Sequence, residues 1–375
     1  MNNCPYFKAC GACSYPLDNY EASLKDKVAR LESKFKIKEV KANPLVYNYR
    51  HKIIYRFFKM KGEIKAGFYE EGSGSLVAIK ECMIQHSYAS EVIKVFLKLA
   101  NKYHMQVYNP KTKSGFLRYL VMRVAKSGKV SLCLVVGDNL FPGSRNFLSQ
   151  LRKECKDIVN FDLLLNRRDT SIVMEGPLKT LYGKGYIQDE LDDLKFLISS
   201  KAFYQVNPYM AEIIYRDVIN YLKPSKDEVV LDAYCGIGTI SLYLVKQAKS
   251  VLAVDINAES IKDAKANAKI NNIENVDFLA HDVKDLAYRE AFDLLVVDPP
   301  RSGMDDAFIK MIIAKKPKRM AYVSCNPETL ERDLKKLGKY YDFEDITLYD
   351  QFGFTKHLEA LTVGKLKNVN IKYKN

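Results

Sequence analysis

Two kinds of long segment are missing from this 375-residue sequence: apolar runs and repeated or biased stretches. No apolar run approaches the roughly 20 residues that cross a bilayer, and no signal peptide opens the chain. No internal repeat or low-complexity linker is apparent. These absences argue against a membrane protein, a secreted protein and a repeat protein. We therefore expect a cytoplasmic protein without a membrane partner, whose length suffices for two or three domains.

Acidic residues are scarce relative to basic ones. The chain has 45 Asp plus Glu against 59 Lys plus Arg, which gives a formal charge of +14. Such a charge favours a polyanionic partner, most simply a nucleic acid, although an enzyme from a lysine-rich proteome would share it.

One segment, residues 92–137, has no acid at all. Its basic residues are Lys94, Lys98, Lys102, Lys111, Lys113, Arg118, Arg123, Lys126 and Lys129. The aromatic residues among them are Phe96, Tyr103, Tyr108, Phe116 and Tyr119. This pattern predicts contact with an RNA backbone, with the aromatic rings stacking on bases. The alternative is a solvated hairpin face beside ordinary core aromatics.

The cysteines lack the second Cys-x2-Cys pair that zinc sites usually have. Cys4, Cys10 and Cys13 are clustered, and Cys82 follows at a distance. Three clustered thiols and a remote fourth are typical of an iron–sulfur cluster, with zinc or unligated thiols as alternatives. Inside the cell, eight cysteines favour metal ligation or catalysis over disulfides.

Hydrophobic patterning divides the rest of the chain into a β-rich middle and an alternating carboxyl-terminal part. Before residue 182 we expect a helix over 21–35, strands within 49–79, a helix over 90–103, a hairpin over 117–136 with its turn at 126–129, and a strand pair within 157–181. After about residue 208, strands and helices alternate, which is typical of a parallel sheet.

A glycine turn in the alternating part lacks the third glycine of a dinucleotide fingerprint. The apolar strand Val229–Leu231 runs into Asp232, and Gly236-x-Gly238 follows, with Thr239 expected to cap the next helix. A second strand ends at Asp255, where a carboxylate can bind a ribose. Asp232 would repel a pyrophosphate but could meet an ammonium group. These features favour S-adenosylmethionine over a dinucleotide.

Three further reactive residues stand at predicted strand ends. Asp298 follows the apolar strand over 292–297, Cys325 follows the strand over 321–323, and Glu359 precedes the strand over 360–363. A thiol at a sheet edge can act as a nucleophile, although a buried structural cysteine is the alternative. A partly desolvated carboxylate is suited to be a general base. Asp282 could accept a hydrogen bond from an adenine amine or could cap a helix.

Together these residues closely resemble the uracil-C5 RNA methyltransferase family over nearly the whole chain. The matching motifs are Ala202-Phe203-Tyr204-Gln205-x-Asn207, Asp232-x-Tyr234-Cys235-Gly236-x-Gly238-Thr239, Asp298-Pro299-Pro300-Arg301, Ser324-Cys325-Asn326-Pro327 and Asp350-x-Phe352-x-x-Thr355-x-His357-x-Glu359. Tyr49-Arg50, Gly67-Phe68-Tyr69 and the four cysteines also match.

The resemblance implies an α/β Rossmann-like class I methyltransferase fold with a mostly parallel seven-stranded sheet. We expect an iron–sulfur segment over 1–40, a β-rich RNA-binding domain over 41–195 and a catalytic domain over 196–375. A [4Fe–4S] cluster would be held by Cys4, Cys10, Cys13 and Cys82.

The resemblance also implies roles for single residues. Cys325 would attack C6 of a uracil, Glu359 would remove the C5 proton, and Asp298 would hold the uracil or its intermediate. The residues expected to bind S-adenosylmethionine are Gln205, Tyr234, Gly236, Thr239, Asp255, Asp282 and Asp298. The family usually has Asn in place of Thr239 and often Glu in place of Asp255.

The organisation resembles the compact iron–sulfur enzymes that methylate 23S ribosomal RNA. Larger relatives begin with a β-barrel RNA-binding module, which we expect to be absent because Cys4 stands almost at the start. We expect a monomer acting on 23S ribosomal RNA to form 5-methyluridine, with transfer RNA as the alternative substrate. Cytosine-C5 methylation and a non-catalytic RNA-binding or folding factor are weaker alternatives.

Overall fold

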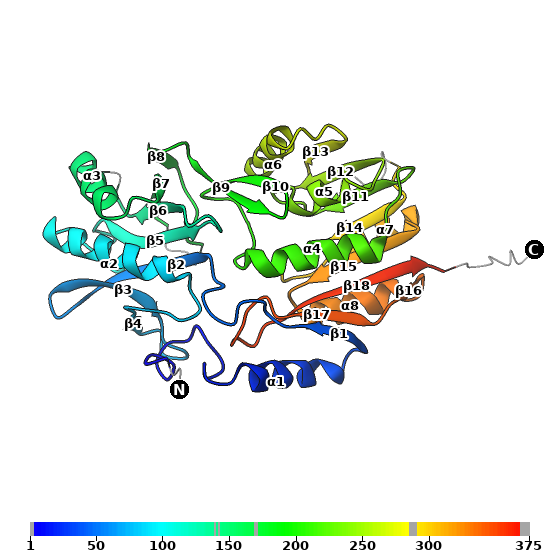
Figure 1. The fold of residues 1–375 in the computed structure, drawn as a ribbon, viewed down its shortest axis with the longest axis horizontal. Coiled ribbons are helices and arrows are strands. Elements are labelled where there is room, and N and C mark those ends of the chain that lie inside the picture. Colours follow the sequence, from blue (N-terminus) through cyan, green and yellow to red (C-terminus); the bar gives the residue numbers. More distant parts are fainter. Residues whose placement is uncertain (1–3, 139, 142, 169–171, 285–290, 368–375) are drawn as a thin grey trace, which may run out of the picture.

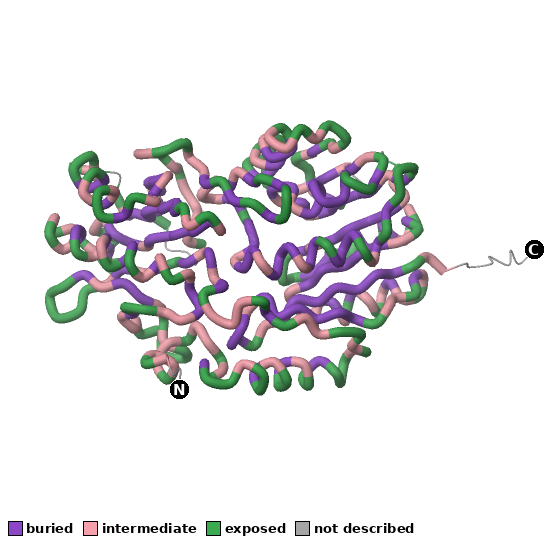
Figure 2. Tube along the Cα trace, viewed as in Figure 1, coloured by how far each residue is buried: buried purple, intermediate pink, exposed green. Residues whose placement is uncertain are grey.

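A computed structural model describes residues 4–138, 140–141, 143–168, 172–284 and 291–367. Two large sheets organise these residues, a central sheet of seven strands and a carboxyl-terminal sheet of nine (Figure 1). Buried residues follow the strands of both sheets and the helix faces turned toward them (Figure 2). Among the described helices, none combines the length and apolar composition needed to cross a lipid bilayer.

The central sheet has the strand order β4-β3-β2-β5-β6-β7-β8. Its strands are β2 (Lys52–Met60), β3 (Glu63–Tyr69), β4 (Leu76–Ala78), β5 (Leu117–Val124), β6 (Val130–Val136), β7 (Ile158–Leu165) and β8 (Leu178–Tyr182). Helices α2 (Ser87–Lys102) and α3 (Ser144–Glu154) pack on one face. The predicted hairpin over 117–136 is confirmed as β5 and β6, and the pair within 157–181 as β7 and β8.

The two faces of the central sheet differ. In β2, Ile53, Tyr55 and Phe57 are buried against α2 and α3, while Lys52, Ile54 and Arg56 alternate onto the other face. We name this other face the open face.

The prediction that the aromatics of 92–137 are available for RNA is wrong for Phe96. Its ring lies in the core between Phe57 and Phe147. Tyr108 is also buried, at 7% exposure, as are Arg118 and Arg123. The spacing of Phe96 matches the buried side of α2, and helical periodicity does not distinguish a core ring from a ligand-binding one.

The carboxyl-terminal sheet has the order β1-β17-β18-β15-β14-β11-β12-β13, with β16 paired to β18. Its strands are β1 (Ile37–Lys41), β11 (Val229–Ala233), β12 (Ser250–Asp255), β13 (Val276–Ala280), β14 (Leu294–Val297), β15 (Arg319–Ser324), β16 (Tyr341–Phe343), β17 (Ile346–Tyr349) and β18 (Glu359–Leu366). Strands β11 to β15 are parallel, and β18 is antiparallel to β15. The expected seven-stranded sheet is therefore present, and β1 and β16 extend it.

Helices cover both faces of this sheet, as expected for a mostly parallel sheet. On one face lie α4 (Pro208–Leu222), α5 (Thr239–Leu244) and α6 (Ala258–Ile270), together with the hairpin of β9 (Tyr186–Leu191) and β10 (Leu194–Ser199). On the other lie α1 (Tyr20–Glu32), α7 (Asp306–Lys315) and α8 (Pro327–Leu337).

The amino-terminal part packs against the carboxyl-terminal sheet, with β1 parallel to β17 at its edge (Figure 1). From α1, the buried Lys27 Nζ lies 2.5 Å from Asp350 Oδ1. The backbone N–H groups of Ser14 and Tyr15 donate to the Phe354 carbonyl at 2.9 and 3.1 Å. These contacts fix the loop between β17 and β18.

Candidate active site

Five strand ends of the carboxyl-terminal sheet meet at one edge. Parallel strands β11, β12, β14 and β15 end there. Antiparallel β18 begins there, so its first residue, Glu359, lies beside the residue that follows β15. The register pairs Ser324 with Ala360, which places Cys325 and Glu359 at adjacent positions.

A cavity of about 510 Å³ opens at this edge. Eight of the predicted site residues line it: Gln205, Tyr234, Gly236, Thr239, Asp255, Asp298, Cys325 and Glu359. Asp282 does not line it. Its side chain accepts the backbone N–H of Lys284 at 3.2 Å and pairs with Lys284 Nζ at 2.8 Å. A ligand role for Asp282 therefore stays a prediction.

The glycine turn reverses the chain between β11 and α5. Tyr234, Gly236 and Gly238 all have positive φ, at 65°, 55° and 82°. Gly238 is the residue that caps α5, so the prediction that Thr239 is the cap is wrong. Thr239 is the first helical residue, which leaves its side chain to line the cavity.

Asp255 holds this turn in shape. Its Oδ2 accepts the N–H of Gly236 at 2.9 Å, and its Oδ1 accepts the N–H of Asn257 at 2.8 Å. Asp232 is fully buried and does not line the cavity. Its Oδ2 accepts the Ser241 hydroxyl at 2.5 Å, while Oδ1 has no partner among the described atoms. Of these two carboxylates, only Asp255 lines the cavity, so contact of Asp232 with an ammonium group stays a prediction.

Burial in the cavity controls the ionisation of the reactive groups. Desolvation raises the pKa of Asp298 to about 7. Burial, with the charge of nearby Asp298, raises the pKa of Glu359 well above its usual range. Burial and both carboxylates raise the pKa of the Cys325 thiol to about 11. Bound positive charge would lower all three pKa values, because a nearby cation favours the anionic forms.

Arg301 is the cation already present near these groups. Its charge opposes the rise in the pKa of both Glu359 and Cys325. Arg301 and Tyr215 both line the cavity, and sequence reasoning gave neither a role. Arg301 could have been singled out because it directly follows Asp298-Pro299-Pro300. Tyr215 had no such signal, since it lies on the buried side of α4 like any core tyrosine.

Gln205 is positioned by a contact distant in sequence. Its Oε1 accepts Gln351 Nε2 at 2.9 Å, and Gln351 is fully buried. Asn207 caps α4 and donates to the Gln351 carbonyl at 3.3 Å. These hydrogen bonds connect the residues that precede α4, Gln205 and Asn207, to the loop that leads to Glu359.

The four amino-terminal cysteines line a separate small cavity with Tyr6, Phe7, Leu17, Phe68 and Ile79. Cys4, Cys10, Cys13 and Cys82 are all partly exposed free thiols. In the part of the chain that the structure describes, no group of three or more His, Cys, Asp or Glu side chains is arranged to hold a metal ion. Cys133 and Cys155, expected to be structural, are buried.

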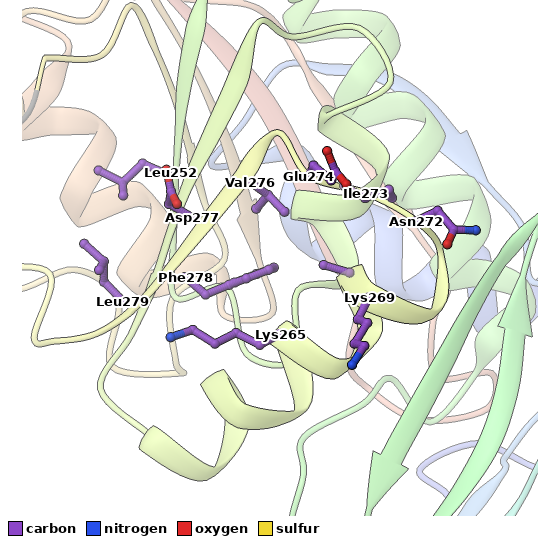
Figure 3. A pocket seen from close by; sticks show the side chains of 11 residues that line it. Leu252, Lys265, Lys269, Asn272, Ile273, Glu274, Val276, Asp277, Phe278 and Leu279 are labelled. Carbon is purple, nitrogen blue, oxygen red and sulfur yellow. The ribbon is translucent and has the colours of Figure 1, made fainter.

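A further hollow of about 740 Å³ lies between α6 and β13, which is the last strand in the order of the carboxyl-terminal sheet (Figure 3). Its lining includes Lys265, Lys269, Asp277 and Phe278. No predicted site residue lies in it, so the reactive groups gather in the 510 Å³ cavity.

Comparison with known proteins agrees with this geometry. The family model described as tRNA (uracil-5-)-methyltransferase matches residues 19–288 and 281–365. An RNA methyltransferase of Halalkalibacterium halodurans is 36% identical over 381 aligned positions, covering 97% of this chain and 83% of the relative. One from Clostridium tetani is 33% identical, covering 96% and 81%.

A solved structure shares the fold of nearly the whole chain. It is Pyrococcus abyssi tRNA (uracil-54, C5)-methyltransferase in complex with S-adenosyl-L-homocysteine, with a TM-score of 0.79 and 29% identity. The match covers 92% of this chain and 83% of that one. The chain is an S-adenosylmethionine-dependent RNA methyltransferase with a class I fold, and it belongs to the tRNA (uracil-5-)-methyltransferase family.

Proposed function

We propose that the protein methylates C5 of a uridine in RNA through a covalent adduct between Cys325 and C6. The observation that carries the proposal is that Cys325, Glu359 and Asp298 line one cavity with the glycine turn and Asp255. Uracil C5 is too weak a nucleophile to take a methyl group unless a nucleophile first adds at C6.

Cys325 first loses its proton to solvent, helped by Arg301. Its thiolate then forms a bond to C6, and the C5–C6 double-bond electrons move to make C5 an enolate-like nucleophile. Bound S-adenosylmethionine supplies an electrophilic methyl group on a sulfonium sulfur and leaves as S-adenosylhomocysteine.

Glu359 accepts the C5 proton after methyl transfer. The electrons of that C–H bond re-form the C5–C6 double bond, and the Cys325–C6 bond breaks to return the thiolate. Asp298 holds the uracil ring or its intermediate. The net change is one methyl group gained and one proton released, so no further reactant is needed. The target base must be unpaired or flipped to reach this cavity.

The residues proposed to hold S-adenosylmethionine are Gln205, Tyr234, Gly236, Thr239, Asp255, Asp282 and Asp298. All except Asp282 line the cavity. Asp255 is already engaged by two backbone N–H groups, and such a fixed carboxylate can accept further hydrogen bonds from a ribose.

For the substrate we propose 23S ribosomal RNA, based on the four-cysteine pattern. Transfer RNA is the second candidate. It is favoured by the Pyrococcus abyssi relative, whose name gives uridine 54 of tRNA as its target.

The test uses labelled S-adenosylmethionine, anaerobically purified protein and separate pools of unmodified ribosomal and transfer RNA, digested to nucleosides. Label in 5-methyluridine from ribosomal RNA supports both chemistry and substrate. Label only in transfer RNA keeps the chemistry and overturns the substrate. Label in 5-methylcytidine, or RNA binding without methyl transfer, contradicts the roles of Cys325 and Glu359.

We also propose that Cys4, Cys10, Cys13 and Cys82 hold a [4Fe–4S] cluster. The described thiol positions do not themselves form a metal site, so the proposal rests on the four-thiol donor set and the shared cavity. Anaerobically purified protein should contain about four iron atoms per chain and absorb near 400 nm. The Cys13→Ser variant should lose both the iron and the absorbance. The control variant, Cys155→Ser, should keep both. A well-folded wild-type protein without iron would contradict it.

A further inference from the structure

A further cleft, of about 700 Å³, lies on the open face of the central sheet. Its lining residues are Gly11, Ala12, Ile54, Arg56, Gly67, Phe68, Tyr69, Pro110, Arg118, Tyr119 and Val173. We name it the arginine–tyrosine groove. Neither the glycine turn nor the reactive groups contribute to it.

Arginines and tyrosines alternate across three neighbouring strands of this groove. The Arg56 guanidinium lies 5.5 Å from the ring centre of Tyr69 and 5.0 Å from that of Tyr119, and it donates to the Tyr119 hydroxyl. The Arg118 guanidinium lies 6.0 Å from the ring centre of Tyr119 and 4.5 Å from that of Tyr108, which is buried and does not line the groove. Planar guanidinium groups beside aromatic rings form the kind of surface on which unpaired bases stack.

The positive charge of the groove is not neutralised within the described part of the chain. Neither Arg56 nor Arg118 forms an ion pair there, and no acidic side chain lines the groove, although exposed Glu71 lies beside Gly11. The Arg118 side chain is only 5% exposed, and its guanidinium donates to the backbone carbonyls of Asn166 and Arg168. Its Nε nevertheless has no hydrogen-bond partner among the described residues. Two fixed, unpaired cations attract an anion such as phosphate.

Four of the seven large apolar side chains that are exposed in the described residues line the groove or the catalytic cavity. Tyr69 is 47% exposed and Ile54 is 37% exposed in the groove. Phe203 and Ile256, at 64% and 73%, line the catalytic cavity. Large exposed apolar surfaces beside uncompensated charge mark places where a partner covers them.

A chain of contacts on this side of the central sheet leads from the groove to the catalytic cavity through the buried Arg123. Lys52, Ile54 and Arg56 share this face of β2, and Lys52 lies about 13 Å along the strand from Arg56. Lys52 pairs in register with Arg123, whose guanidinium donates to the Ala202 carbonyl at 3.2 Å. Residues on either side of Ala202, Lys201 and Phe203, line the catalytic cavity.

We propose that the arginine–tyrosine groove binds an unpaired base and a flanking phosphate of the same RNA strand whose target uridine enters the catalytic cavity. This inference rests on the proposed action on RNA. It assigns the groove a specific occupant, single-stranded RNA, because the aromatic faces suit bases and the two arginines suit phosphate.

The test measures binding of a fluorescently labelled 15-nucleotide oligouridine RNA in the presence of S-adenosylhomocysteine. Tyr69→Ala should weaken binding at least about fivefold, and Tyr69→Phe, which keeps the ring, should restore it. Arg56→Gln should weaken binding and reduce the dependence on salt by about one phosphate contact. Arg145→Gln, which removes an exposed charge from α3 outside the groove, should change affinity less than about twofold.

Each outcome decides the inference. If Tyr69→Ala and Arg56→Gln bind RNA as Arg145→Gln does, while wild-type protein methylates RNA, the groove does not hold RNA. Tighter binding of the wild-type protein to a fully paired duplex would overturn the single-stranded occupant. Wild-type protein that neither binds nor methylates any RNA would instead refute the proposed function. Binding of S-adenosylhomocysteine and the unfolding temperature of each variant verify that it is folded.

Discussion

At the scale of single residues, burial in the catalytic cavity raises the pKa of the carboxyl groups that the proposed reaction uses. Desolvation raises the pKa of Asp298 to about 7 and also raises that of Glu359. A carboxyl whose pKa is raised by folding binds its proton more tightly in the native state than in the unfolded state. Stability is therefore lost as pH rises from the unfolded pKa near 4 toward the folded pKa. At neutral pH the folded protein is therefore less stable than it would be with an uncharged side chain in place of Asp298.

Asp298→Asn should remove this cost. At pH 8 the variant should be more stable than wild type by about 1–2 kcal/mol, which is less than the ~4 kcal/mol of a fully desolvated group because the side chain is partly exposed. Near pH 4 the difference should shrink to about 0.5 kcal/mol or less, because Asp298 is then protonated in the native state and about half protonated in the unfolded state. Urea unfolding at both pH values measures this. An equal effect at pH 4 and pH 8 would show that ionisation of Asp298 is not the cause.

Asp255→Asn should weaken cofactor binding about tenfold. The amide keeps one oxygen for the Gly236 N–H but loses the charge and the second acceptor. Calorimetric titration with S-adenosylhomocysteine measures the effect. Asp277→Asn, on β13 outside the cavity, is the matched control, and equal affinities for the two variants would contradict a role for Asp255 in binding.

Strand-end residues were predictable from sequence because an apolar run followed by a polar residue marks an edge of a parallel sheet. This reasoning found Asp255, Asp298 and Cys325. It did not identify Tyr215, whose position in the sequence is that of a core residue. The sequence also predicted Thr239 as the N-cap of α5, whereas Gly238 is the N-cap. Helical and strand periods identify buried positions, but they do not say which of these border a cavity.

At the scale of elements, helix α1 acts as a brace for the loop before Glu359. Lys27 pairs with Asp350 inside the protein, and the Tyr20 hydroxyl donates to the same carboxylate at 2.7 Å. The next residues of that loop include Phe352, which lines the catalytic cavity. The brace therefore links the first helix to the position of the proposed base.

Lys27→Met should destabilise the protein by about 3 kcal/mol, because it leaves the Asp350 charge buried without its cation. Adding Asp350→Asn should recover part of the loss, since the amide carries no charge and still accepts from Tyr20. Urea unfolding at pH 7.5 measures both variants. Lys25→Met on the exposed side of α1 should have little effect. A loss below about 0.5 kcal/mol for Lys27→Met would contradict the brace.

The brace was not predictable from sequence. The periodicity of residues 21–35 correctly predicted a helix, yet nothing local indicates that Lys27 is buried. Its partner lies 323 positions away, and contacts at that separation leave no repeating pattern in the sequence. Strand β1 was missed for the same reason, because it is short and its pairing partner is β17.

At the scale of the whole molecule, the amino-terminal part is shared between the two sheets. The predicted boundary between residues 40 and 41 stays a prediction, and it lies inside β1, which completes the carboxyl-terminal sheet. Gly11 and Ala12 line the arginine–tyrosine groove, while α1 braces the catalytic loop. The first forty residues thus line the arginine–tyrosine groove and support the loop that leads to Glu359.

A chain that begins at residue 42 should therefore aggregate or unfold at a markedly lower temperature than the full protein. Loss of β1 exposes the edge of β17, and loss of α1 leaves Asp350 unpaired. A chain that begins at residue 16 lacks Cys4, Cys10 and Cys13 as the first truncation does, but keeps α1 and β1, so the two truncations differ in these elements. Thermal unfolding and size-exclusion chromatography distinguish them, and equal behaviour of the two truncations would contradict the shared role.

The central claim is that Cys325 forms a covalent bond to the RNA base and that Glu359 is needed to release it. The decisive measurement is denaturing electrophoresis and intact mass of Glu359→Gln after incubation with S-adenosylmethionine and substrate RNA. The account predicts a stable protein–RNA adduct carrying one added methyl group, and none for Glu359→Gln combined with Cys325→Ala. A methylated RNA product without any adduct, or an adduct that persists without Cys325, would contradict it.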